Sequence, residues 1–316
     1  MAGVVHVAAG ALLDASGRIL LARRHDDAHQ GGLWEFPGGK MESGETPEAA
    51  LARELHEEIG VWVEAAQPLI RVAHCYPDLE VVLHVYRVHA WSGEPHSREG
   101  QALAWVEPKA LTAYPMPAAD RPIVAALQLP DRYVITPPEI SDPKGFLAQL
   151  DALLTRGLRL LQYRVFEAAG ADPLELFQAV EESCRRAGAV VLLNAAMPGA
   201  ERLQPQGLHL SSRQLFSWER RPADMTWVAA SCHDADDLVR ARQLGLDFAV
   251  LSPVLPTRSH PDAEPLRWEG FTRLVSDAGL PVYALGGMHE RLLTAAQEAG
   301  AQGIAGIRGF WDDAKL

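Results

Sequence analysis

The 316-residue sequence lacks the features of several large protein classes. It contains no uninterrupted run of about 18 apolar residues, so we expect no transmembrane helix and no membrane partner. Its start has no basic segment, so we expect no cleaved signal peptide. The three cysteines, Cys75, Cys184 and Cys232, are too few and too dispersed for a disulfide framework or a zinc site. This scarcity is typical of a reducing cytoplasm.

Positive charge is also scarce in this chain. It has 29 lysines and arginines against 41 aspartates and glutamates, a formal net charge of -12. Proteins that hold nucleic acid through its phosphates need a basic surface, so we expect no direct binding to a nucleic-acid duplex. A small anionic substrate can still bind where a metal ion supplies the positive charge.

The length is about twice the ~150 residues of an average domain and predicts two domains, 1–130 and 131–316. The change of pattern falls near Pro130-Asp131-Arg132. The first part predicts antiparallel strands with two helices, an α+β domain with a mixed sheet and flanking helices. Segments 4–13 and 18–24 predict a hairpin across the turn Asp14–Gly17. Further strands are expected at 68–75, 80–91 and 103–106, and helices at 46–59 and 121–127.

The second part alternates short β-rich runs with helical stretches. Strands are expected at 133–136, 160–165, 190–194, 207–211, 227–232, 248–254, 282–287 and 303–307. The clearest helices are expected at 174–186, 234–244 and 289–299. Eight such runs predict an α/β domain, a (β/α)8 TIM-type barrel. An open Rossmann-type sheet is the alternative, but the segment has no GxGxxG motif.

The expected helix 46–59 has clear ends and two distinct faces. Thr46 can cap its start, and Gly60 can end it in a left-handed conformation. Leu51, Leu55 and Ile59 recur every four residues and predict one buried stripe.

The other face of this helix carries three glutamates. Glu54, Glu57 and Glu58 are spaced i, i+3 and i+4, so their side chains share one face. Like charges on one face repel each other, and a solvated acidic face is one interpretation. Hard oxygen ligands beside the Gly38-Gly39 pair instead suit Mg²⁺, bound through carboxylates and substrate phosphates.

The segment from Gly39 to Val61 resembles the Nudix box at every defined position, including Glu45 and Arg53–Glu54. Segments 23–29, 34–40 and 91–95 extend the resemblance to MutT-type 8-oxo-dGTP diphosphatases over residues 1–130. The resemblance implies cleavage between the α- and β-phosphates of a nucleoside triphosphate. For 8-oxo-dGTP this releases 8-oxo-dGMP and pyrophosphate, a nucleotide-pool sanitation that serves DNA repair and replication.

The resemblance also implies roles for individual residues. Mg²⁺, with Mn²⁺ as the alternative ion, would be held by Glu54, Glu57, Glu58 and the carbonyl of Gly38 or Gly39. Arg53 would orient the glutamates, and Glu45 would support the junction of loop and helix. Glu99 matches a second acidic position, where it would act as a metal ligand or base. An exposed loop carboxylate is the alternative interpretation of Glu99.

Four positions bear on the choice of substrate. Arg24 matches a position that contacts the nucleotide, Phe36 one that lines the base pocket, and Tyr76 an aromatic position. For both aromatic residues, plain core packing is the alternative. Asp120 stands where the family has an asparagine that reads the oxidised purine. An ionised aspartate would repel the purine O6, whereas a protonated one could donate to it.

The second part resembles thiamine-phosphate synthase and its TenI-type relatives over about 132–311. The matches are Gln162-Tyr163-Arg164, Gly207–Leu210, Ser231-Cys232-His233, Ser252-Pro253-Val254 and Leu285–Met288. Each ends an expected strand, where barrel active sites form. Gly286 and Gly287 could hold a phosphate through backbone N–H groups, and tight turns are the alternative reason for both glycines.

The barrel sequence departs from the synthase pattern at catalytic positions. Phe166 stands where the family has a lysine, and Ala195 and Ser212 stand where it has acidic residues. We therefore expect no working synthase, but a binder of a thiazole or pyrimidine phosphate. Two alternatives to nucleotide sanitation remain. The first part could hydrolyse a pyrophosphate of the thiamine pathway, and the barrel could be a regulatory or assembly module.

Overall fold

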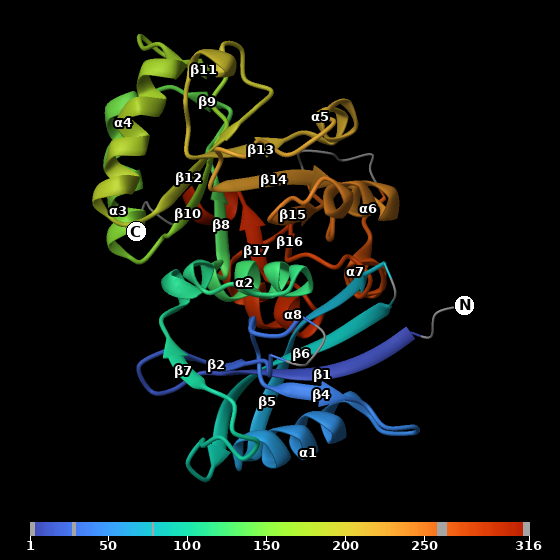
Figure 1. The fold of residues 1–316 in the computed structure, drawn as a ribbon. Helices are drawn as coiled ribbons and strands as arrows, with labels where there is room; N and C mark the ends of the chain where they lie inside the picture. Colours follow the sequence, from blue (N-terminus) through green and yellow to red (C-terminus); the bar gives the residue numbers. More distant parts are fainter. Residues whose placement is uncertain (1–3, 27–29, 78, 258–263, 312–316) are drawn as a thin grey trace. The chain divides into compact units, whose positions relative to one another are not determined.

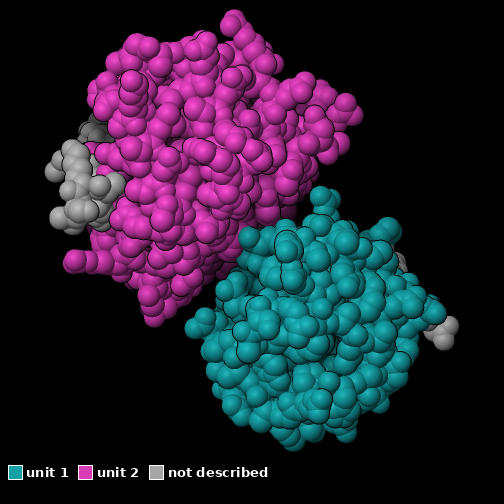
Figure 2. All heavy atoms as spheres, turned by 90° about the vertical axis from the view of Figure 1, so that its left-hand side faces the viewer, with its two compact units in different colours: residues 1–128 teal, residues 129–316 magenta. Residues whose placement is uncertain are grey.

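The computed structural model describes residues 4–26, 30–77, 79–257 and 264–311. The chain divides into two compact units, Met1–Gln128 and Leu129–Leu316 (Figure 2). The described residues include no helix long and apolar enough to cross a membrane. Cys75, Cys184 and Cys232 are free thiols, as expected.

The first unit contains two small sheets (Figure 1). The larger is mixed, because β1 runs parallel to β6 and antiparallel to β4. In spatial order its strands are β4 (Gly38–Lys40), β1 (Val4–Leu12), β6 (Glu80–Ser92) and β5 (Trp62–Cys75). The smaller is antiparallel, with β3 (Trp34–Glu35), β2 (Ile19–Arg23) and β7 (Leu103–Val106).

The predicted hairpin of the first two strands is wrong in its pairing. The turn is present, since Gly17 N–H donates to the Asp14 carbonyl at 2.9 Å. Beyond the single bridge between Leu13 and Ile19, however, β1 and β2 belong to different sheets. Both edges of β1 are already taken by β4 and β6. The partners of this strand are therefore set by distant segments.

Helix α1 (Pro47–Ile59) confirms the predicted ends and the buried stripe. The Thr46 side chain accepts from Ala49 N–H, and Gly60 is left-handed with φ 73°. Leu51, Leu55 and Ile59 are buried in a core cluster with β1 and β6. The rest of the unit contains α2 (Arg121–Gln128) and the 3-10 helices η1 (Pro108–Ala113) and η2 (Ala118–Asp120).

The second unit is a closed barrel of eight parallel strands, as predicted. Its order is β8 (Arg132–Ile135), β10 (Leu160–Tyr163), β12 (Val190–Asn194), β13 (Gly207–Leu210), β14 (Trp227–Cys232), β15 (Phe248–Leu251), β16 (Val282–Ala284) and β17 (Gly303–Gly306). Strand β17 pairs with β8 and closes the ring. The rings of Tyr133, Phe248 and Tyr283 lie within 5.2–5.7 Å of one another.

Helices surround the barrel (Figure 1). They are α3 (Pro143–Thr155), α4 (Pro173–Arg186), α5 (Ser212–Ser217), α6 (Ala235–Gln243), α7 (Arg267–Val275), α8 (Leu293–Glu298) and α9 (Arg308–Trp311), with η3 (Ala200–Arg202) and η4 (Glu290–Leu292). A two-stranded pair, β9 (Glu139–Ile140) and β11 (Glu167–Ala168), lies outside the barrel sheet. Segment 289–299, predicted as one helix, is divided into η4 and α8.

Candidate active site

The two glycines of β4 bring the backbone of this strand close to the glutamates of α1. Gly38 N–H donates to Glu58 Oε2 at 3.0 Å. A Cβ atom built at Gly39 would lie 2.3 Å from the Glu54 carboxylate. The Glu54 and Glu58 carboxylates therefore lie against successive residues of one strand, and Gly39 leaves room for one of them.

Arg53 links the other carboxylates of this region. Its Nη1 donates to Glu54 Oε1 at 2.8 Å and to Glu57 Oε2 at 3.1 Å. Its Nε and Nη2 donate to the Glu45 carboxylate at 3.0 and 2.9 Å. The hydrogen bonds that Arg53 donates to Glu45, and next those to Glu54, raise the pKa of Arg53. Glu45 also accepts from Glu42 N–H, so it connects the loop to the helix.

Three other carboxylates act on Glu58. Partial burial raises its pKa to about 8, the Gly38 N–H bond opposes the shift, and Glu35, Glu99 and Glu54 add to it. Four carboxyl groups near one another, three of them half-buried, repel unless a cation or protons neutralise them. This donor set, beside a glycine that makes room for Glu54, fits a divalent cation with oxygen ligands.

The described residues do not bring three such side chains together as a preformed metal centre. The Glu57 carboxylate is 56% exposed and turned to Arg53, whereas Glu58 is turned to Gly38. The Glu99 side chain is exposed, although its charge acts on Glu58. The predicted ligands thus lie around the C-terminal half of α1 without converging on one point.

A second polar cluster surrounds Asp120, which is only 6% exposed. Burial raises the pKa of Asp120 to about 8, Glu35 adds to the shift, and Arg24 opposes it. Arg24 forms an ion pair with Glu35. The Tyr76 hydroxyl hydrogen-bonds to the backbone of Ala119, next to Asp120. The structure therefore brings Arg24, Tyr76 and Asp120 together.

Phe36 is buried in the core cluster that also contains Ala119 and, at its edge, Tyr76. Glu35, the residue before it, was not predicted as a site residue. Its charge raises the pKa of Glu58 and that of Asp120, so it lies between the two clusters. Burial raises the pKa of Glu35 itself, and Arg24 opposes this. The sequence offered one signal for Glu35, a carboxylate between the apolar residues Trp34 and Phe36.

The barrel contains a chain of buried, hydrogen-bonded polar groups. Asn194 Oδ1 accepts from Ala196 N–H, so its amide nitrogen donates to Gln162 Oε1 at 3.3 Å. Gln162 Nε2 then donates to the Tyr133 hydroxyl at 3.3 Å. These residues lie on three neighbouring strands, Tyr133 in β8, Gln162 in β10 and Asn194 at the end of β12.

The chain continues through a buried histidine. The Tyr133 hydroxyl is 3.1 Å from His209 Nδ1, and His209 Nε2 is 2.9 Å from Ser231 Oγ. Burial lowers the pKa of His209 to about 3, so the imidazole is neutral and carries one proton. The proton lies either on Nε2, with Nδ1 accepting from Tyr133, or on Nδ1, with Nε2 accepting from Ser231, because a hydroxyl can accept two hydrogen bonds and donate one.

Gly286 and Gly287 lie where β15 and β16 end. Both have positive φ, 100° and 70°, and a Cβ at Gly286 would lie 2.9 Å from Pro253 Cα. Close backbone packing therefore requires glycine at position 286, whatever binds there.

Phe166 packs against the guanidinium of Arg164, with 5.3 Å between the centre of the ring and Arg164 Cζ.

Two family models match the chain. The model described as thiamine monophosphate synthase matches residues 132–310, and the model described as NUDIX domain matches residues 8–126. An 8-oxo-dGTP diphosphatase of Escherichia coli is 37% identical over 124 residues, 39% of this chain and 96% of the relative. A putative thiamine-phosphate synthase 2 of Aquifex aeolicus is 30% identical over 185 residues, 58% of this chain and 99% of the relative.

The chain belongs to both families. Its first unit is a Nudix pyrophosphohydrolase, and its second unit is a thiamine monophosphate synthase-family barrel. A CTP pyrophosphohydrolase of Escherichia coli is 36% identical over 116 residues, 37% of this chain and 86% of the relative. This value is close to that of the 8-oxo-dGTP diphosphatase, so overall identity does not decide which base the Nudix unit reads.

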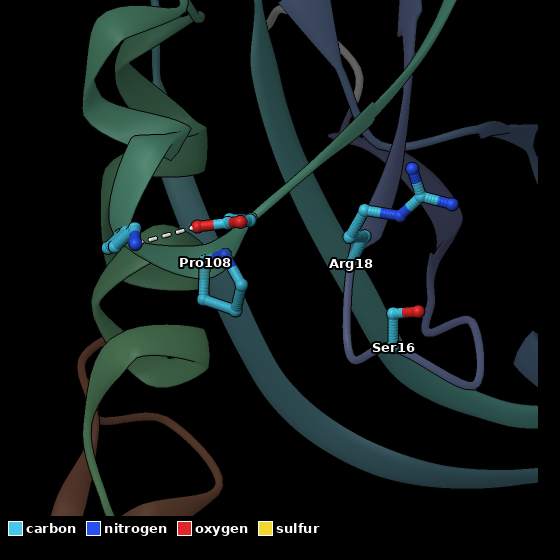
Figure 3. A pocket seen from close by; sticks show the side chains of 5 residues that line it. Ser16, Arg18 and Pro108 are labelled. Carbon is cyan, nitrogen blue, oxygen red and sulfur yellow. Dashed lines mark ion pairs between the residues drawn. The ribbon is translucent and has the colours of Figure 1, made fainter.

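A surface hollow in the Nudix unit is separate from this chemistry (Figure 3). It is lined by Ser16, Arg18, Glu107, Pro108 and Lys109. Arg18 pairs with Asp14 at 2.7 Å, and Lys109 pairs with Glu107 at 2.9 Å. Its lining includes none of the predicted site residues, and its cations are paired within the chain.

Proposed function

We propose that the Nudix unit is a Mg²⁺-dependent diphosphatase that converts 8-oxo-dGTP to 8-oxo-dGMP and pyrophosphate, a nucleotide-pool sanitation in the cytoplasm that serves DNA repair. Glu54, Glu57, Glu58 and the carbonyl of Gly38 or Gly39 would hold the ion. When bound, it neutralises phosphate charge and lowers the pKa of a bound water. Glu99 is proposed as a further ligand or base.

The residues of the chain supply the rest of the chemistry. Arg53 holds the Glu54 and Glu57 carboxylates on one side of α1 through its two hydrogen bonds. Arg24, which pairs with Glu35 and acts on Asp120, would provide a cation near the nucleotide. Phe36 and Tyr76 provide an apolar wall for a base.

Asp120 is the observation that carries the choice of base. With its pKa near 8, the carboxyl is protonated at neutral pH. Its O–H can then donate to the purine O6, while its carbonyl oxygen accepts from N7–H, which guanine lacks and 8-oxoguanine has. A protonated Asp120 thus replaces the asparagine of the resembling family without reversing its hydrogen bonds.

This assignment predicts that recognition of the purine depends on pH. Below about pH 8 the Asp120 carboxyl keeps its proton and its donor; above that pH it is ionised and repels O6. Since guanine and 8-oxoguanine both carry O6, the kcat/KM for each of the two nucleotides should fall as the pH rises through about 8, whereas N7–H is accepted by Asp120 in either state. Glu35, Arg24 and Tyr76 are the ionisable groups that act on Asp120.

Two variants test this assignment. Asp120→Asn should retain the selectivity for 8-oxo-dGTP over dGTP and should lose the decline in kcat/KM above about pH 8. Its kcat/KM is compared with that of wild type at each pH, so that the effects of the shared metal ligands cancel. Asp120→Ala should reduce the selectivity by ~1–3 kcal/mol at neutral pH, since the base edge is left unpaired. A selectivity unchanged in both variants would place Asp120 outside the base pocket.

For the barrel, we propose a role as a binder of a thiazole or pyrimidine phosphate. The Ser231 hydroxyl, which is hydrogen-bonded to His209, can also form a hydrogen bond with a polar group of such a ligand. The glycines at 286 and 287 would offer backbone N–H groups to the phosphate.

We expect the barrel not to join a thiazole phosphate to a pyrimidine pyrophosphate. A departing pyrophosphate needs neutralisation, and Phe166, Ala195 and Ser212 cannot replace a lysine and two metal-binding carboxylates. The full chain incubated with both substrates and Mg²⁺ should form no thiamine phosphate. Turnover at rates ordinary for enzymes would contradict this expectation.

A further inference from the structure

The segment 96–101 is tied to the C-terminal turn of α1, whose last carbonyls have no partners within the helix. His96 N–H donates to the Ile59 carbonyl at 3.1 Å, and Arg98 N–H donates to the Glu58 carbonyl at 3.0 Å. The Arg98 guanidinium donates to the His56 carbonyl at 2.7 Å. The loop that carries Glu99 therefore caps the helix that carries the other glutamates.

Gln101 is the side chain at the centre of this junction. Its Nε2 donates to the Glu58 carbonyl at 3.2 Å. Its Oε1 accepts from Ser97 Oγ at 2.7 Å and from Glu99 N–H at 3.1 Å. In the described part of the Nudix unit, Gln101 and Asp120 are the two buried polar side chains, 8% and 6% exposed. Such burial is stable because the hydrogen bonds of the amide are made.

Gly100 shapes the turn between Glu99 and Gln101. Its φ is +84°, a left-handed conformation that favours glycine, and a Cβ atom there would meet nothing within 4 Å. The turn lets the Gln101 side chain fold back to Glu99 N–H. As a result the backbone of Glu99 is held, although its carboxylate is exposed.

We propose that Gln101 is a positioning residue that holds Glu99 beside Glu58 and thereby strengthens cation binding at this end of α1. The inference rests on the proposed function, because it takes both carboxylates as part of the cation site. A carboxylate on an unanchored loop would lose conformational freedom when it binds a cation. The bonds of Gln101 order the loop beforehand.

Direct binding of Mn²⁺ to the full chain without substrate tests this role, with free Mn²⁺ measured by electron paramagnetic resonance. Gln101→Leu should raise the Kd for Mn²⁺ about tenfold, the size of effect typical of residues that orient ligands. Gln128→Leu is the matched control, since Gln128 Nε2 also donates to a backbone carbonyl, that of Pro108 at 2.8 Å. It should leave the Kd within about twofold of wild type, even if both variants lower Tm equally.

The pathway through Glu99 is tested by a double-mutant cycle. In a Glu99→Gln chain, Gln101→Leu should weaken Mn²⁺ binding no further, because the two residues act as one unit. Equal weakening in both backgrounds, or no weakening in either, would overturn the proposal. If Gln101→Leu does not fold, Gly100→Ala replaces it, because alanine strains the same turn without a clash. This variant should raise the Kd for Mn²⁺ in a chain that keeps Glu99, and should not raise it in a Glu99→Gln chain. An unchanged Kd in Gly100→Ala would then overturn the proposal.

Failure of the proposed function would give a different result. Glu57→Gln included in the same series should raise the Kd far more than Gln101→Leu does. An unchanged Kd in Glu57→Gln would show that the box does not bind a cation. If Glu57→Gln raises the Kd strongly while Gln101→Leu raises it equally with and without Glu99, only the positioning role of Gln101 is overturned.

Discussion

Replacing Glu57 by glutamine is expected to abolish nucleotide hydrolysis and to leave the fold intact. The Glu57 carboxylate is 56% exposed and bonded to Arg53. An exposed ion pair contributes at most about 1 kcal/mol to stability. If the carboxylate holds a cation, its loss removes about 4 kcal/mol of transition-state stabilisation, about a thousandfold in kcat. Glu54→Gln should behave alike.

Steady-state kinetics and thermal unfolding of the same preparations separate activity from stability. Glu64→Gln is a suitable control, because it makes the same change at an exposed glutamate of β5, outside the box. It should retain wild-type activity. If Glu54→Gln and Glu57→Gln both stayed within about threefold of wild type, the acidic face would be merely solvated and the metal site would be rejected.

Alanine at Gly39 is expected to remove activity by displacing a ligand. Its Cβ would lie 2.3 Å from the Glu54 carboxylate, the movable end of a long side chain. The carboxylate can swing away at little cost to the fold, but it then leaves the position that Gly39 provides. We expect kcat/KM to fall about a hundredfold, as for the loss of an oriented charged group, with Tm nearly unchanged.

The neighbouring glycine provides the matched comparison. A Cβ at Gly38 would lie 2.2 Å from the Ala8 carbonyl oxygen, and its φ is +149°. Backbone cannot move aside as a side-chain end can, so Gly38→Ala should unfold at a markedly lower temperature. If Gly39→Ala kept its activity, hydrolysis would not require the Glu54 carboxylate to lie beside β4.

Much of the fold could be predicted because its signals are local. The cap at Thr46 and the left-handed Gly60 set the ends of α1. The strands of the barrel are short apolar runs between helices, and each was found within a few residues. The pairing of β1 could not be predicted, because β4 and β6, both distant in sequence, occupy its edges.

The residues of the candidate site that belong to a sequence motif could be predicted. Residues that reach the site only through the tertiary structure could not. Glu35 and Gln101 carry no signature of their own; they matter because of Asp120, Glu58 and Glu99, which only the tertiary structure brings near. Gly286 shows the reverse case. Glycine there suggested phosphate binding, and the close approach of Pro253 supplies a second, structural reason for it.

The central claim is tested most directly by a comparison of substrates. The purified full chain is assayed at one Mg²⁺ concentration with 8-oxo-dGTP, dGTP, CTP, thiamine pyrophosphate and ADP-ribose. The account predicts that 8-oxo-dGTP gives 8-oxo-dGMP and pyrophosphate with the highest kcat/KM, at least about tenfold above dGTP, because only the oxidised base satisfies both oxygens of a protonated Asp120. A higher kcat/KM for thiamine pyrophosphate, CTP or unoxidised dGTP would contradict it.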